Sequence, residues 1–157
     1  MSFIDLLRKL LPSNVKTDEE INAFHTIEHG IPIGTITVDD VLMENDHLDT
    51  NENKLKNMQV WVYQDEGTLP HFHLISESDG FYSAIRLDVP EYFLHGKYSD
   101  TLNSSEKKAL QKFLSKDAEY EDTSNWRFLR MAWNSTSNMK YLCKVETIPD
   151  YRDLPDK

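Results

Sequence analysis

The chain contains 157 residues, of which 39% are hydrophobic and 28% are charged, a composition typical of a globular protein that is long enough to bury one core. Its formal net charge of −10 argues against direct nucleic-acid binding, because neutralising phosphate groups requires clustered Lys and Arg. No apolar run reaches the length of a membrane span, and the single cysteine, Cys143, excludes an internal disulfide framework and favours the cytoplasm.

The N-terminal part of the chain combines one helical pattern with two strand patterns. Apolar residues recur at helical spacing in residues 2–11, which predicts a short amphipathic helix that ends before Pro12 and leaves homodimerisation open. Residues 30–34 contain two glycines and a proline and are predicted to form a turn. Strands are expected at 35–43 and 58–63, with the polar stretch between them as a loop.

A β-hairpin is predicted around Asp79-Gly80, because this pair favours the two-residue turn that joins antiparallel strands. A two-residue loop places His73 opposite Arg86 and His71 opposite Asp88. Side chains alternate between the faces of a strand, so one face carries the apolar residues Phe72, Leu74, Ile85 and Leu87. The other face carries the polar residues His71, His73, Arg86, Asp88, Glu77 and Tyr82.

Two helices are predicted after the hairpin. Asn103 and Glu106 have the spacing of a capping box. A second helix begins near Asp122-Thr123-Ser124 and carries Trp126, Leu129 and Trp133 on one side. We therefore expect a single domain over 1–157, with an N-terminal helix at 2–11, a sheet at 35–88, C-terminal helices at 104–134 and a short tail. The predicted fold class is α+β, an antiparallel β-meander of about four strands with helices packed on one face.

The histidines of the hairpin suggest a metal site. His71 and His73 are two residues apart on one predicted strand, so both imidazoles point to the same face, as in many metal sites. His95, Asp88 or Glu77 would complete the ligand set, and imidazole with carboxylate suits a divalent ion such as zinc, manganese or iron. The candidate metal ligands are His71, His73 and His95.

Two other interpretations of the hairpin face need no metal. In one, the histidines form a satisfied polar cluster under the helices. In the other, His71 is a general base that Asp88 orients, and Arg86 binds an anionic group, which makes these three the candidate catalytic residues. Cys143 is expected to be a packing residue rather than a nucleophile.

A second histidine pair lies in the run His25-Thr-Ile-Glu28-His29, which matches the His-x-x-Glu-His pattern of the inverse zincins. That chemistry needs both histidines on a stable helix. The helix-breaking residues Gly30 and Pro32 follow directly, so a metal site is not predicted here.

The run Pro70-His71-Phe72-His73-Leu74, with the acidic turn and amphipathic helix that follow, resembles a family of small uncharacterised bacterial domains, the domain-of-unknown-function 4160 type. The signature of that family is Pro-Pro-His-Phe-His-Val, and the resemblance covers roughly residues 60–114, with Leu69 in place of the first proline. Members of the family often lie near toxin–antitoxin modules, and no molecular activity is established for them. The resemblance therefore implies a fold rather than a reaction.

Two functions follow as expectations. The first is a small acidic cytoplasmic binding protein that acts through protein–protein contacts, of the kind that phages or mobile elements use as an inhibitor or accessory protein, with a partner that carries a basic surface. The second is a metal- or anion-binding, hydrolase-like enzyme that uses the face with His71, His73, Arg86 and Asp88.

Overall fold

A computed structural model of the chain describes residues 30–37, 57–63, 69–119, 122–137 and 141–155. The helix predicted at 2–11, the loop expected between the first two strands, and His25, Glu28 and His29 lie outside these residues. Four strands form one antiparallel sheet in the order β1-β2-β3-β4. They are β1 (Gly30–Ile36), β2 (Met58–Tyr63), β3 (His71–Ser76) and β4 (Phe81–Arg86).

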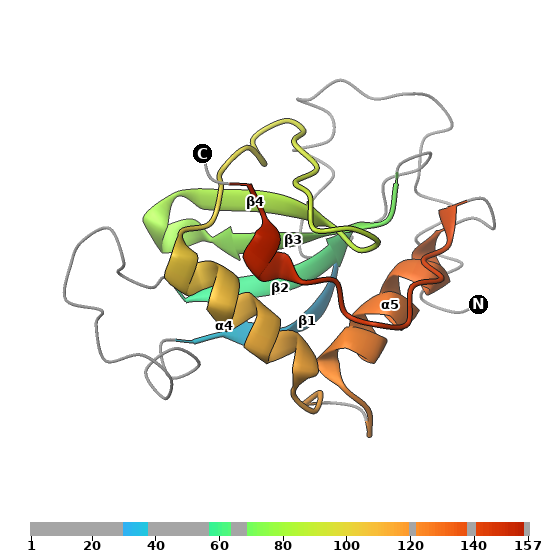
Figure 1. Cartoon of the computed structure of the whole chain (residues 1–157). Coiled ribbons are helices and arrows are strands. Elements are labelled where there is room, and N and C mark those ends of the chain that lie inside the picture. Colours follow the sequence, from blue (N-terminus) through green and yellow to red (C-terminus); the bar gives the residue numbers. More distant parts are fainter. Residues whose placement is uncertain (1–29, 38–56, 64–68, 120–121, 138–140, 156–157) are drawn as a thin grey trace.

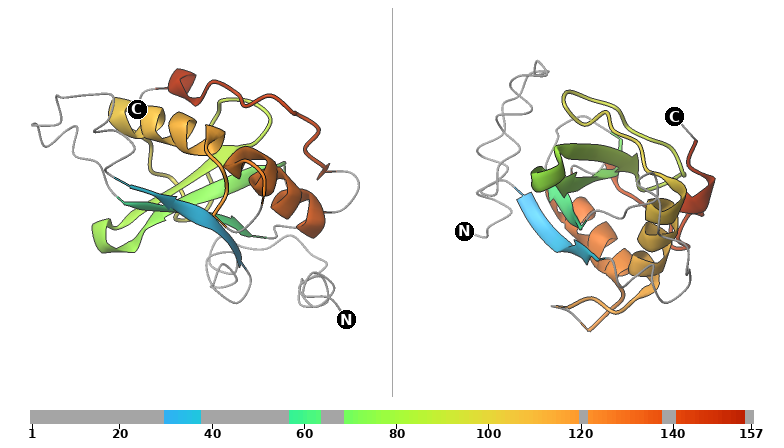
Figure 2. Two further views of the ribbon diagram at one scale, coloured as in Figure 1. Left: turned by 90° about the horizontal axis from the view of Figure 1, so that it is seen from below. Right: turned by 90° about the vertical axis from the view of Figure 1, so that its left-hand side faces the viewer.

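Two helices, α4 (Ser104–Ser115) and α5 (Asn125–Thr136), pack on one side of this sheet (Figures 1 and 2). The predicted α+β meander with helices on one face is therefore confirmed. The main core lies between the two layers, where Phe72 and Leu74 from the sheet meet Leu110 and Trp133 from the helices. The C-terminal tail, residues 141–155, contains a one-turn 3-10 helix, η5 (Tyr151–Asp153), which packs against α4.

The sequence predicted both helix starts. The Asn103 side chain accepts a hydrogen bond of 2.8 Å from the Glu106 N–H, and the Glu106 carboxylate accepts one of 2.9 Å from the Asn103 N–H, so the capping box is complete. The Ser124 hydroxyl accepts a hydrogen bond of 3.1 Å from the backbone of Arg127 at the start of α5. These caps satisfy N–H groups that have no partner within a helix.

The turn predicted at residues 30–34 is wrong, because this segment is most of β1. Proline is tolerated in a strand where its missing N–H breaks no ladder bond. β1 pairs only with β2 among the described strands, and its register shifts between Pro32 and Gly34, as in a β-bulge. Ile33 and Ile36 are fully buried in the main core, so the sheet begins at Gly30 rather than at Thr35.

The predicted hairpin register is also wrong. Four residues separate β3 from β4: the 3-10 turn η3 (Glu77–Asp79) and Gly80, which adopts a left-handed conformation with φ 62°. The Ser76 hydroxyl donates a 2.6 Å hydrogen bond to the Asp79 carboxylate and stabilises this longer loop. His71 consequently lies opposite Arg86, and His73 lies opposite Ala84. The register differs by two residues, so the predicted faces of the strands are retained.

Gly34 allows β1 to approach α4 closely. A Cβ atom at this position would lie 2.8 Å from the Phe113 Cζ atom, which is closer than van der Waals contact. We predict that Gly34→Ala lowers the free energy of unfolding by about 1–3 kcal/mol, because the ring is held in a packed core. Urea unfolding followed by circular dichroism measures this change.

A smaller side chain at residue 113 provides the matched control for this prediction. In a Phe113→Leu background the clash is relieved, so Gly34→Ala should cost less than it does in the unmodified chain. Equal costs in the two backgrounds would contradict the proposed contact.

Candidate metal centre

Strand β3 places two imidazoles on the same face of the sheet. His71 and His73 are two residues apart, and both are fully buried. Every residue of β3 is buried, because the strand is central in the sheet and both of its faces are covered. The helix layer covers the face with Phe72 and Leu74. A second apolar cluster, formed by Tyr63, Ile75, Ala84 and Tyr98, occupies the face with the histidines.

The third imidazole comes from the segment after β4. This segment, residues 87–103, runs back along the outer edge of β4, where the Phe93 N–H donates to the Ala84 carbonyl at 2.9 Å and the Asp100 N–H donates to the Tyr82 carbonyl at 2.9 Å. A turn between these bonds includes Gly96, whose φ is 55°. The turn brings His95 over the face of β3 that carries the other two histidines.

The three imidazoles form a nearly equilateral triangle. The ring centroid of His71 lies 5.0 Å from that of His73, and the centroid of His95 lies 5.2 Å from each of the other two. Each residue offers one ring nitrogen, and these nitrogens all lie within 4.8 Å of one another. The structure therefore brings together all three histidines that the sequence selected as metal ligands, in a cluster that could hold a metal ion.

Backbone carbonyls orient two of the three rings. The Nδ1 atom of His71 lies 2.7 Å from the Leu69 carbonyl oxygen, and the Nδ1 atom of His95 lies 3.0 Å from the Phe93 carbonyl oxygen. A carbonyl oxygen only accepts hydrogen bonds, so Nδ1 carries the proton in both rings, and Nε2 is then the nitrogen whose lone pair could bind a metal ion. Protein metal sites commonly fix their histidine ligands in this way.

Aromatic side chains form the wall of the cluster. The Phe93 ring stacks on His71 with centroids 4.4 Å apart, and the Trp133 ring of α5 lies 5.2 Å from the same imidazole. The Tyr98 ring packs edge-on against His73 at 4.2 Å. These walls restrict water, and ionic interactions are stronger in such surroundings than in bulk solvent. His95 is only half-buried, so the cluster is closest to solvent on its side.

The charged residues predicted for this face pair with one another. The Arg86 guanidinium donates two hydrogen bonds to Asp88, of 2.9 and 2.8 Å, and contacts Glu91 at 3.2 Å. The hydrogen bond with Asp88 raises the pKa of Arg86. The interpretation in which Asp88 lies opposite His71 and orients it is corrected here, because the hairpin register places Arg86 opposite that histidine. Glu77 is exposed in η3, at the far end of β3 from His71.

Comparisons of the chain with protein-family models, with curated proteins and with solved structures find no match. The resemblance to the Pro-His-Phe-His domains therefore stays a prediction. Among the residues that the structure describes, no helix is both long enough and apolar enough to cross a membrane.

Cys143 is buried in the main core, and its burial raises the pKa of the thiol. A raised pKa keeps the group as the unreactive thiol at neutral pH. We predict that the folded protein reacts with a disulfide reagent at least about tenfold more slowly than the chain in concentrated guanidinium chloride. Absorbance of the released thiolate measures the rate.

An exposed thiol on the same protein is the control for this measurement. Ser78 is exposed in η3, so Ser78→Cys in a Cys143→Ala background should react rapidly in the folded state. Rapid reaction of Cys143 itself in the folded protein would contradict its assignment as a packing residue.

Proposed function

We propose that this protein binds one divalent transition-metal ion, such as zinc, through His71, His73 and His95. The observation that carries the proposal is the convergence of three buried or half-buried imidazole nitrogens within 4.8 Å of one another. A tetrahedral zinc ion holds nitrogen ligands about 3.4 Å apart, so small inward movements of the rings would let all three share one ion.

The chemistry of the donor set supports zinc or a neighbouring metal. Imidazole is a borderline ligand that suits zinc, copper, iron and nickel, whereas calcium and magnesium prefer oxygen. The described cluster contains three imidazoles and no carboxylate. The carbonyl groups of Leu69 and Phe93 already fix two of the rings, so little rotational freedom is lost on binding.

A bound metal would act on the fold and on chemistry. Two ligands belong to β3 and the third belongs to residues 87–103, so the ion would join the strand to the returning segment. When bound by three histidines, zinc keeps a fourth position for water and lowers the pKa of that water, which supports hydrolysis. The hydrolase-like function that the sequence predicts is therefore proposed for the form of the protein that has zinc bound.

We predict that the untagged protein, reconstituted with zinc and desalted, retains about one ion per chain. The double variant His71→Ala/His73→Ala and the single variant His95→Ala should each retain less than about a tenth of this amount, because two ligands or one hold zinc weakly. Mass spectrometry with inductively coupled plasma measures the metal content. His47→Ala, which changes a histidine outside the cluster, should retain the wild-type amount.

Thermal unfolding provides the second readout of metal binding. Zinc at about a hundred times its dissociation constant should raise the Tm of the wild type by roughly 5–10 °C, because the ion binds the folded state only. The same zinc should leave the Tm of a correctly folded His95→Ala variant unchanged. A metal-free wild type whose Tm does not respond to zinc would contradict the proposal.

A second proposal, supported by the distribution of charge, is association with a basic protein partner. Residues 1–100 contain 18 acidic and 7 basic side chains, whereas residues 101–157 contain 9 acidic and 10 basic ones. Residues 39–52 alone contain six acidic side chains and no Lys or Arg. Charge of one sign concentrated in one part of a chain steers an oppositely charged partner and makes the association sensitive to salt.

We predict that the immobilised protein captures a basic partner from extracts of its source cell at about 50 mM salt and releases it at about 500 mM salt, because screening shortens the range of the attraction. A variant with the six acidic residues of 39–52 changed to Asn and Gln should capture less of the same partner. Sedimentation of the purified protein tests for a homodimer separately. Capture that is equal in both variants would contradict this role of the acidic residues.

A further inference from the structure

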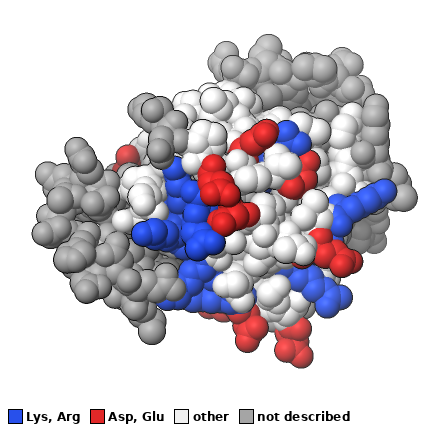
Figure 3. All heavy atoms as spheres, viewed as in Figure 1, with Lys and Arg blue, Asp and Glu red and all other residues white. Residues whose placement is uncertain are grey.

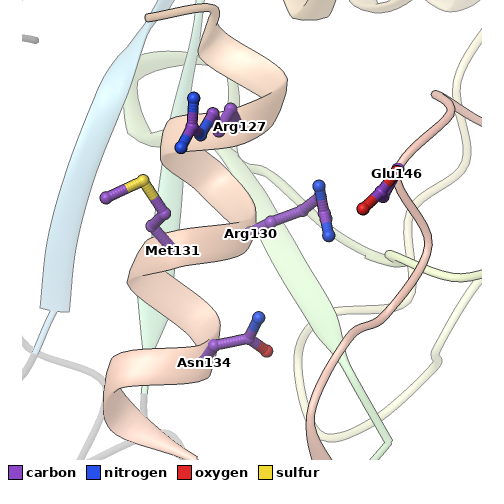
Figure 4. Close-up of a pocket in the computed structure, with 5 residues that line it drawn as sticks. All are labelled: Arg127, Arg130, Met131, Asn134 and Glu146. Atoms are coloured by element: carbon purple, nitrogen blue, oxygen red, sulfur yellow. The ribbon is translucent and has the colours of Figure 1, made fainter.

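A cleft of about 410 Å³ lies beside α5, outside the histidine cluster. Its lining comes from one face of α5 and from the tail that follows the helix, and consists of Arg127, Arg130, Met131, Asn134 and Glu146 (Figure 4). This volume is in the range of pockets that bind small molecules. The cleft and the candidate metal centre have no residue in common.

Two guanidinium groups line this cleft, and that of Arg130 points toward Glu146 (Figure 4). Arg127 and Arg130 lie three residues apart and therefore on neighbouring positions of one helix face. Within the described parts of the chain, neither forms an ion pair with a carboxylate, whereas Arg86 pairs with Asp88 and Arg152 pairs with Asp150. The Nε–H group of Arg130 is buried and has no hydrogen-bond acceptor among the described residues.

The walls of the cleft are held in place. The Asn134 side chain accepts a 2.7 Å hydrogen bond from the Cys143 N–H and donates one of 3.1 Å to the Cys143 carbonyl, which ties the tail to α5. The indole of Trp126 donates to the Glu146 carbonyl at 2.9 Å, so the tail is also fixed at the position of the acidic lining residue. Because the helix and the tail are fixed, little backbone conformational entropy would be lost when a ligand binds to this cleft.

The surroundings of the cleft are more basic than the protein as a whole. The C-terminal 57 residues carry 10 basic and 9 acidic side chains, whereas the first 100 residues carry 7 basic and 18 acidic ones. Figure 3 shows Lys and Arg gathered over α4 on the helix-covered face and further basic side chains over α5, with Asp and Glu side chains beside both groups. An anion that approaches this face therefore meets less electrostatic repulsion than the net charge of the whole protein would produce.

We infer that this cleft binds a small oxyanion, a phosphate monoester or a carboxylate, through the guanidinium groups of Arg127 and Arg130. Guanidinium is planar and presents paired N–H donors that match the oxygens of these anions. The exposed thioether of Met131 provides an apolar contact for the remainder of the ligand. Glu146 lines the same cleft and repels negative charge, so it favours a ligand whose far end is neutral or cationic.

The test is a titration followed by NMR of the Nε–Hε groups of arginine in the full-length protein, at constant ionic strength. The probes are inorganic phosphate, O-phosphoethanolamine and acetate, with chloride as the control for a general salt effect. We expect saturable shifts of the Arg127 and Arg130 signals with at least one probe and only linear drift with chloride. Saturation with phosphate or with acetate shows which oxyanion the cleft prefers.

Charge variants of the lining complete the experiment. Arg127 is exposed and Arg130 is half-buried. Arg127→Gln and Arg130→Gln should each weaken anion binding at least about tenfold, because each variant removes a charged hydrogen-bond donor. Glu146→Gln should strengthen phosphate binding by about threefold by removing a repulsive charge. Arg152→Gln, whose guanidinium is paired with Asp150 outside the cleft, should change nothing.

Drift without saturation for all three probes would overturn the inference, and so would equal affinities of the wild type and a folded Arg127→Gln variant. The exposed position of Arg127 keeps the test valid if Arg130→Gln fails to fold. The titrations are carried out both with and without zinc, so that anion binding at the cleft is tested separately from metal binding at the histidines.

Discussion

Backbone hydrogen bonds along the outer edge of β4 hold residues 87–103 against the sheet, and the histidine cluster depends on them. Arg86, Phe93 and Asp100 donate the N–H groups of three such bonds, each 2.9 Å long. Because these bonds satisfy an edge that would otherwise be exposed, they fix the returning segment without a regular fifth strand. The same segment supplies His95, the ring that stacks on His71 and the ring that packs on His73. One backbone arrangement therefore supplies the third imidazole and much of the wall around all three.

The position of the cluster follows from how a central strand is buried. Both faces of β3 are covered. Because side chains alternate between the faces of a strand, Phe72 and Leu74 point into the main core, whereas His71 and His73 point to the opposite face. Burying polar rings is costly unless their nitrogens are satisfied. For His71 and His95 the solution is the same local contact, a hydrogen bond from Nδ1 to the carbonyl two residues earlier. In this tautomer the lone pair lies on Nε2, the atom through which such a ring would bind a metal ion.

Structural features that depend on a local sequence pattern can be predicted from the sequence alone. The faces of the hairpin depend only on the period of two, so they survived an error of two residues in the register. The partner of His71 depends on the length of the turn, and the hydrogen bond between Ser76 and Asp79 that lengthens the turn has no simple sequence signal. The turn predicted over β1 is wrong because Pro32 and the two glycines have the composition of a turn, whereas a bulged strand also tolerates them. The contacts of Phe93, Tyr98 and Trp133 with the histidines join segments distant in sequence, which periodicity does not reveal.

The arginine residues show how the same side chain takes different roles in one acidic protein. Arg86 and Arg152 each lie two residues from an aspartate and form bidentate pairs with it, so local sequence is sufficient to neutralise them. Arg127 and Arg130 have no acidic residue within four positions on α5, and the apolar stripe of Trp126 and Trp133 directs them away from the core. Their acidic neighbour, Glu146, reaches the cleft only because the tail folds back along the helix. In a chain with ten more acidic than basic residues, two adjacent arginines without a described carboxylate partner require an explanation. Binding of an external anion provides one, since it would relieve the repulsion between two like charges on one helix face.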